Sequence, residues 1–317
     1  MDLTTNQSRP REDRFRHEAL VYDGPDAFAG VVGPFVADAL AADEPVLVMT
    51  PPDRIDTLRR YLGDDAARVR FEDMTGVGRN PARIIPAWQA FAEEHSGRSV
   101  RGVGEPAWAG RSPDELEECR LHESLINLAF RGSDGFWLAC PYDGSSLDAP
   151  VLEDAHRTHP LAGGTPLISY AGVEDAAGLF AEQLPVPPAS AERLDYDNET
   201  ARSVRRFATE IAQRAGLDAV ASANFALTAH ELAINSVVHG GGGGTIDAWI
   251  TPTALIGEVR DRGLIADPLT GRIRPSVDVE GGRGIWLANQ LCDLVQLRSS
   301  RAGTSVRFHV ARSGNTD

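Results

Sequence analysis

Two residues four positions apart are the first candidates for chemistry in this chain of 317 residues. Glu231 and Asn235 are predicted to share one face of a helix over residues 219–238. An amide oxygen suits Mg²⁺ that bridges nucleotide phosphates, and a carboxylate can orient or deprotonate an attacking group. A solvated polar face is the alternative interpretation of this pair. Three apolar neighbours are expected to pack inward: Leu232, Ile234 and Val238.

A second motif, Asp261-Arg262-Gly263, follows the apolar run 255–259. A carboxylate at a strand end can accept a hydrogen bond from the exocyclic amine of adenine, and a glycine lets the backbone approach the base. Asp-x-Gly is also a common turn, so this motif alone is a weak indication.

A third group of residues is rich in glycine. Gly281, Gly282 and Gly284 lead into a helix predicted over residues 285–292, whose free backbone N–H groups can meet phosphate oxygens. A flexible loop is the alternative. Thr304 opens the last predicted strand, where its hydroxyl can join a water network around adenine; by itself the segment reads as a hairpin turn.

Alternating apolar runs and amphipathic stretches must position these motifs. In the first half, their order predicts an α/β domain with a parallel sheet covered on both faces. Strands are expected at 17–22, 45–50, 69–72, 99–103 and 136–142, and helices at 26–42, 53–61, 81–94 and 114–129. In the second half, helices are expected at 199–215, 219–238 and 285–292, strands at 245–251, 254–260, 294–299 and 303–310, and a lid-like stretch at 263–282.

Length and composition agree with two domains, since a single core stops growing near about 250 to 300 residues. We predict a loose tail over 1–14, a first domain over 15–162, a proline-containing linker over 163–195 and a second domain over 196–312. The net charge of -15 disfavours direct binding to DNA. All 31 basic residues are arginine, so lysine-based mechanisms are excluded.

The three cysteines are odd in number and far apart in the sequence, which disfavours a disulfide framework. No apolar segment reaches the length of a membrane span, so we expect a cytoplasmic protein that does not bind a membrane.

The order and spacing of Glu231…Asn235, Asp261-x-Gly263, Gly281-x-x-Gly284 and Gly303-Thr304 resemble the N, G1, G2 and final boxes of the GHKL ATPases. The resemblance covers residues 196–310. It implies an α/β sandwich of the Bergerat type, with ATP and Mg²⁺ bound between helices under a mobile lid. Asn235 would hold Mg²⁺, and Asp261, Gly263, Gly281, Gly282, Gly284 and Thr304 would contribute to the nucleotide site.

Among GHKL proteins, the compact domain looks most like the anti-sigma serine kinases of the RsbW type. That resemblance implies a sigma factor and an anti-sigma antagonist protein as partners, with Glu231 as the base toward a serine or threonine hydroxyl of the antagonist. A sensor histidine kinase that feeds a response regulator and a catalytically idle ATP-dependent binding module are the alternatives. His17-Glu18 superficially resembles a phospho-acceptor motif but precedes a predicted strand. A homodimer is left open.

Three segments of the first domain, residues 101–108, 118–123 and 140–143, resemble the MEDS sensory domain. The resemblance spans residues 15–162 and implies a RecA-like α/β core without a working P-loop. Cys119, His122 and Glu123 are predicted to share one helix face, with Cys140, His156 and His159 as further candidates for a metal or haem site. An organic ligand near Glu105, Trp108, Glu123 and Asp143 is the second interpretation, and purely structural roles are the third. The small ligand itself is left unidentified.

Overall fold

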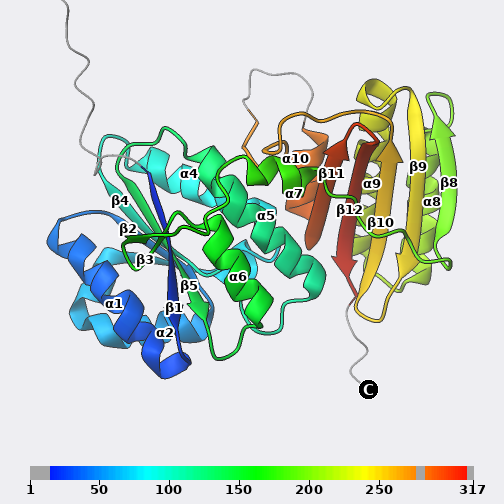
Figure 1. Ribbon diagram of the computed structural model, residues 1–317. Helices are drawn as coiled ribbons and strands as arrows, with labels where there is room; N and C mark the ends of the chain where they lie inside the picture. Colours follow the sequence, from blue (N-terminus) through cyan, green and yellow to red (C-terminus); the bar gives the residue numbers. More distant parts are fainter. Residues whose placement is uncertain (1–14, 276–282, 313–317) are drawn as a thin grey trace, which may run out of the picture. The chain divides into compact units, whose positions relative to one another are not determined.

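The computed structural model describes residues 15–275 and 283–312, which form two compact units (Figure 1). The first unit combines the chain up to Val77 with residues 87–112 and 126–172. The second combines residues 78–86 and 113–125 with the chain from Val173 onward. One helix, α5 (Pro113–Ala129), therefore contributes residues to both units. The two predicted classes, an α/β domain with a parallel sheet and a GHKL-type α/β sandwich, are confirmed.

The first unit is built on a seven-stranded sheet in the order β3-β2-β4-β5-β1-β6-β7. Its strands pair in parallel except for the final pair, β6 with β7. The strands are β1 (Arg16–Tyr22), β2 (Val46–Thr50), β3 (Val69–Asp73), β4 (Val100–Gly104), β5 (Phe136–Asp143), β6 (Leu161–Ala162) and β7 (Thr165–Pro166).

Helices cover both faces of this sheet, as the apolar character of β2 requires. Helices α1 and α2 lie along one face, and α4, the end of α5 and α6 lie along the other (Figure 1). The helices are α1 (Pro25–Ala41), α2 (Pro52–Leu62), α3 (Met74–Val77), α4 (Ile84–Glu94) and α6 (Ala149–Thr158), with a 3₁₀ turn at Gly63–Arg68. A second 3₁₀ turn, Pro81–Arg83, and the first residues of α4 belong to the second unit.

Helix α1 shows how sequence pattern becomes core. Phe28, Val32, Val36 and Ala39 recur at helical spacing and are each 0% exposed. They pack in one cluster with Val48 of β2 and other residues of the sheet. This apolar cluster therefore fixes α1 against the sheet. It also helps to position the strand ends that carry polar residues.

The second unit is a sandwich of one antiparallel sheet and a layer of helices. Its sheet has the order β11-β12-β10-β9-β8, and α9 contacts β9, β10 and β12. The strands are β8 (Glu192–Asp197), β9 (Gly243–Ile250), β10 (Ala254–Asp261), β11 (Leu294–Ser300) and β12 (Gly303–Ala311), and the helices are α7 (Asp175–Ala181), α8 (Arg202–Arg214), α9 (Ala219–His239) and α10 (Gly284–Leu291).

Three local expectations differ from the structure. The predicted linker over 163–195 contains helix α7 and the beginning of β8. Strand β9 begins at Gly243, two residues before its predicted start. Ile234 and Val238 are 36% and 64% exposed rather than packed inward, because the buried face of α9 is set by Ala229, Leu232, Ala233 and Ser236.

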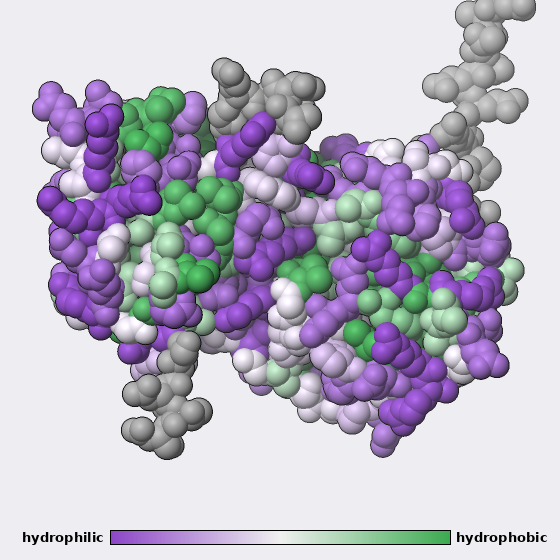
Figure 2. Space-filling model, turned by 180° about the vertical axis from the view of Figure 1, so that it is seen from behind, coloured by the Kyte–Doolittle hydropathy of each residue, from purple (hydrophilic) through white to green (hydrophobic). Residues whose placement is uncertain are grey.

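Among the residues that the structure describes, no helix is both long enough and apolar enough to span a membrane. Hydrophilic side chains cover most of the face shown in Figure 2, and apolar side chains form small separate patches there.

Candidate functional site

A pocket of about 330 Å³ opens in the second unit and is bordered by α9, β10, α10 and β12. Its volume lies at the lower end of the range for small-molecule sites, about 300 to 1,000 Å³. Most of its lining is apolar, with a few polar groups that converge on it. The lining residues are Leu232, Asn235, Ser236, His239, Gly240, Val259, Asp261, Gly263, Leu264, Ile265, Thr270, Ile285, Thr304 and Val306.

Asp261, the last residue of β10, is a polar group of the pocket that hydrogen bonds hold in place. Its Oδ2 accepts a hydrogen bond of 2.7 Å from the Ser236 hydroxyl, and its Oδ1 accepts one of 2.7 Å from the Gly263 N–H. An ionised carboxylate has about four acceptor positions, so each oxygen can accept one more hydrogen bond. Asp261 is thus fixed in place and still able to receive an amine of a bound base.

Thr304 closes the Asp261-x-Gly263 turn from the neighbouring strand. It lies opposite Asp261 in the pairing of β10 with β12, and its hydroxyl donates to the Gly263 carbonyl at 2.9 Å. A further hydrogen bond of 2.7 Å joins the hydroxyls of Thr304 and Ser299. The hydroxyl that was expected in a water network around adenine therefore also holds the turn itself.

Asn235 lines the same pocket from α9, and helix α10 begins beside it. A Cβ built on Gly284, the first residue of α10, would lie 2.6 Å from Asn235 Nδ2. Only glycine lets the helix N-terminus approach this amide so closely. A Mg²⁺-bound nucleotide requires an oxygen ligand for the metal, N–H groups for the phosphates and an acceptor for an amine of the base. The Asn235 amide oxygen, the N-terminus of α10 and the remaining acceptor positions of Asp261 can supply these, so the residues fit Mg-ATP.

Glu231 lies one helical turn before Asn235 and is half-buried. It is not among the residues that line the pocket within the described chain. Gly281 and Gly282 lie outside the described residues. Of the predicted nucleotide-site residues, the structure brings Asn235, Asp261, Gly263 and Thr304 together around one pocket and places Gly284 against Asn235.

The glycine run after α9 has a steric reason that the sequence did not reveal. A Cβ on Gly240 would lie 2.4 Å from Asp261 Cγ, and one on Gly244 would lie 2.3 Å from the Arg260 carbonyl oxygen. Gly241 and Gly242 have φ of 92° and 94°, which L side chains rarely adopt. The run therefore lets the chain leave α9 and enter β9 directly against the Asp261 strand.

Another pocket, of about 220 Å³, lies in the first unit at the carboxyl edge of its sheet. Neighbouring strands β2 and β4 connect to helices on opposite faces there, and such a switch point is where open α/β sheets bind ligands. Glu105 follows β4, and Asp143 ends β5. The lining residues are Pro51, Asp53, Arg54, Glu105, Trp108, Ala109, Asp143 and Ser146.

Arg54 and Tyr22, which the sequence did not single out, connect the acids of this pocket. The Tyr22 hydroxyl donates to Glu105 Oε1 at 2.6 Å and accepts from Arg54 Nε at 3.1 Å, while Arg54 Nη2 donates to Asp143 Oδ2 at 3.2 Å. Trp108 lies beside them, with the Arg111 guanidinium 3.6 Å from its ring centroid.

Two carboxyl groups of this pocket, those of Glu105 and Asp143, have pKa values shifted in opposite directions. Burial raises the pKa of Glu105 to about 8, against the lowering effect of its hydrogen bond from Tyr22. Burial opposes ionisation of Asp143 as well, but hydrogen bonds from Ser145 and Gly24 hold its pKa below the ordinary value. At neutral pH the pocket therefore offers a neutral carboxylic acid, a carboxylate and a guanidinium.

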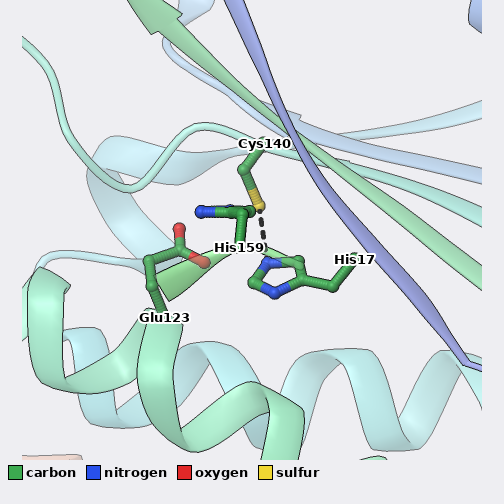
Figure 3. Close-up of side chains that lie close together, drawn as sticks. All are labelled: His17, Glu123, Cys140 and His159. Carbon is green, nitrogen blue, oxygen red and sulfur yellow. Dashed lines mark hydrogen bonds between the residues drawn. The ribbon is translucent and has the colours of Figure 1, made fainter. Parts of the chain in front are cut away.

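Cys119, His122 and Glu123 are buried on α5 and do not line that pocket. Glu123 instead meets His17 of β1, Cys140 of β5 and His159 after α6, as Figure 3 shows. The sequence named three of these four residues as candidates and missed the proximity of His17. Burial lowers the pKa of His17 to about 3, so its ring is neutral.

Each of the two parts of the chain matches a known protein family. Residues 16–160 match the family described as MEDS, the methanogen/methylotroph, DcmR sensory domain, and residues 194–310 match the histidine kinase-like ATPase domain. The chain is thus a sensory domain joined to an ATPase-type domain. It carries a MEDS domain followed by a GHKL domain.

One solved structure similar to part of this chain contains the RsbU and RsbW domains of Rv1364c from Mycobacterium tuberculosis. The identity is 20%, the TM-score is 0.30, and the match covers 42% of this chain and 35% of that one. No curated protein matched the sequence.

Proposed function

We propose that this protein is a sensory anti-sigma regulator. In this proposal it binds Mg-ATP and phosphorylates a serine or threonine of an anti-sigma antagonist protein, and it thereby controls a sigma factor. The observation that carries the proposal is the meeting of Asn235, Asp261, Gly263 and Thr304, from separate motifs, around one pocket.

The roles within this pocket follow from its chemistry. Asp261 would accept a hydrogen bond from the adenine amine, since Ser236 and Gly263 hold it without using all its acceptor positions. Asn235 would supply an oxygen to the Mg²⁺ that neutralises the phosphates. The N-terminus of α10, which begins beside Asn235, favours anionic oxygens through its N–H groups.

Glu231 is the proposed base toward the attacking hydroxyl. It lies on α9 one turn before Asn235, so a hydroxyl placed near the phosphate end of the site is within reach of the same helix face. The hydroxyl oxygen would form the new bond to the terminal phosphorus, its proton would go to Glu231, and ADP would leave.

The position of His17 favours a partner's hydroxyl over a histidine of this chain as phosphate acceptor. His17 lies on strand β1 and is 1% exposed, whereas a phospho-acceptor must reach the nucleotide of a kinase domain. This observation disfavours the histidine kinase alternative that used His17.

The test is phosphotransfer from radiolabelled ATP to candidate antagonist proteins, with wild type compared to Asn235→Ala. Asn198→Ala, at an exposed position outside the pocket, is the matched control. We expect acid-stable label on the antagonist with wild type and Asn198→Ala and its loss with Asn235→Ala. Acid-labile label on this chain itself would support the histidine kinase, and bound ATP without any transfer would support an idle binding module.

We also propose that the pocket of the first unit binds the signal molecule. Arg54, Asp143 and the neutral Glu105 offer polar groups beside the Trp108 ring, which suits a small organic molecule with a polar end and an apolar body. The pocket volume of about 220 Å³ limits the ligand to a size below that of typical drug molecules. Cys119 and His122 are not part of this proposed ligand site, and Glu123 belongs to the other cluster.

A further inference from the structure

The side-chain cluster formed by His17, Glu123, Cys140 and His159 has the composition of a metal site. One potential ligand atom of each residue lies within 4.8 Å of all the others, and the four residues are between 0% and 2% exposed. They come from β1, α5, β5 and the residue after α6, which are far apart in the sequence (Figure 3). Two imidazole nitrogens, a thiol sulfur and a carboxyl group buried together at this depth require an explanation.

Hydrogen bonds set both imidazole rings in the orientation of metal ligands. The Asn127 amide donates through Nδ2 to the Thr158 carbonyl at 2.8 Å, so its Oδ1, 3.1 Å from His17 Nδ1, is an acceptor. His159 Nδ1 lies 2.8 Å from the Ala155 carbonyl oxygen, which can only accept. Each histidine therefore carries its proton on Nδ1 and presents the lone pair of Nε2.

This arrangement is typical of histidine ligands, whose second nitrogen donates to a carbonyl or amide oxygen and so fixes the tautomer. His17 Nε2 lies 3.4 Å from Cys140 Sγ, within the cluster. The rings of His17 and His159 lie with their centroids 4.0 Å apart, a separation that two imidazolium cations would not tolerate. Neutral imidazole is the form that binds metals.

Glu123 completes the set from α5. It precedes Asn127 by one turn of the same continuous helix, and the Asn127 side chain accepts a hydrogen bond from His17. A thiolate and a carboxylate together balance the charge of a divalent cation. The loaded cluster would consequently be neutral, which removes the main cost of burying ions.

We propose that His17 Nε2, His159 Nε2, Cys140 Sγ and a Glu123 carboxylate oxygen bind one divalent metal ion, Zn²⁺ by preference. Imidazole, thiolate and carboxylate are the ligands of zinc sites, and four protein ligands make a closed tetrahedral site of the structural kind. Ligand atoms around tetrahedral zinc are separated by roughly 3.3 to 3.8 Å, so separations of up to 4.8 Å in the present cluster would shorten by roughly 1 to 1.5 Å.

Such an ion would join β1, β5, α5 and the end of α6 in the interior of the sensory domain. Binding would release the Cys140 thiol proton to solvent, because the thiolate is the ligand. The site is separate from the pocket lined by Glu105, Trp108 and Asp143. Removal of the metal is therefore expected to lower the stability of the domain as well as to affect sensing.

The test uses the full-length protein without ATP, so its outcome is independent of the proposed kinase activity. Metal content is measured after gel filtration, and the metal is then removed with a chelator and replaced by Co²⁺. We expect one zinc per chain, followed by a thiolate-to-cobalt charge-transfer band with d–d bands of tetrahedral intensity. A folded wild type that retains neither Zn²⁺ nor Co²⁺ would overturn the proposal.

Two variants identify the sulfur ligand. Cys140→Ser should abolish the charge-transfer band, whereas Cys119→Ser, at another buried thiol, should leave it unchanged. The reverse result would contradict the assignment. X-ray absorption at the zinc edge of the wild type keeps the test valid if Cys140→Ser does not fold: one sulfur among nitrogen and oxygen neighbours is expected, and a shell without sulfur would refute the site.

Discussion

At the scale of single residues, the proposed nucleotide pocket depends on a carboxylate whose position is determined by its neighbours. Asp261 is held from α9 by Ser236 and from its own turn by Gly263. Its proposed role toward adenine would therefore be preorganised, because a bound base would not need to move it. Losses at this residue should appear in nucleotide affinity and in base selectivity, and only modestly in the fold.

We expect Asp261→Asn to weaken ATP binding by roughly 10- to 100-fold, since a hydrogen bond to a charged group contributes about 1.5 to 3 kcal/mol. Isothermal titration with a non-hydrolysable ATP analogue measures the change, with a guanine analogue beside it to test selectivity. Asp64→Asn, the same substitution at an exposed position of the first unit, should bind like wild type. Unchanged affinity in Asp261→Asn would remove this residue from the site.

Glu105 predicts how the stability of the folded protein depends on pH. Its pKa in the folded protein is raised to about 8 from 4.5 by burial, so the folded state holds a proton that the unfolded state releases at neutral pH. Its contribution to stability is therefore complete below pH 4.5 and is lost as pH rises through about 8. Thermal unfolding followed across this range should show a declining melting temperature in wild type and a flatter profile in Glu105→Gln, which mimics the protonated form.

At the scale of elements, the sequence predicted most helices and strands but not the pairs of residues that lie between them. Apolar runs such as Val46–Thr50 and helical spacing such as that of α1 are local patterns, and they placed those elements within a few residues. The edge strand β8 was missed because only Tyr196 of its six residues is buried, so it has no apolar alternation.

The proximity of the residues in the cluster around His17 could likewise not be predicted from the sequence. His17 and Cys140 are 123 residues apart, and their meeting depends on the parallel pairing of β1 with β5, which no local pattern specifies. The nucleotide motifs were accessible because their order along the chain follows a known family pattern. The steric need for Gly240, by contrast, became apparent only when Asp261 was placed beside it.

Gly240→Ala tests how strictly α9 must approach β10. A Cβ at this position would lie 2.4 Å from Asp261 Cγ, so the carboxylate or the backbone has to shift. We expect a loss of stability of about 1 to 3 kcal/mol by overpacking, together with weaker ATP binding. Urea unfolding and nucleotide titration measure the two effects.

The matched control is Gly178→Ala on α7, where an added Cβ meets no atom within 4 Å. There the substitution should be neutral or stabilising by about 0.5 to 1 kcal/mol, because alanine favours a helix over glycine. Equal effects of the two substitutions would mean that the contact with Asp261 is unimportant.

At the scale of the whole molecule, a sensory domain and an ATPase-type domain are combined in one chain. If a ligand of the first changes the ATP affinity of the second, ATP must change the affinity for that ligand by the same factor. The net charge of -15 makes a protein partner a better match to this surface than a nucleic acid.

We propose that the pocket bordered by α9, β10 and α10 binds Mg-ATP, and equilibrium binding of ATP to purified full-length protein tests this most directly. We predict one ATP per chain, dependence on Mg²⁺, and a loss of about tenfold or more in Asn235→Ala but not in Asn198→Ala. A folded wild-type protein that binds no ATP in the presence of Mg²⁺ would contradict the account.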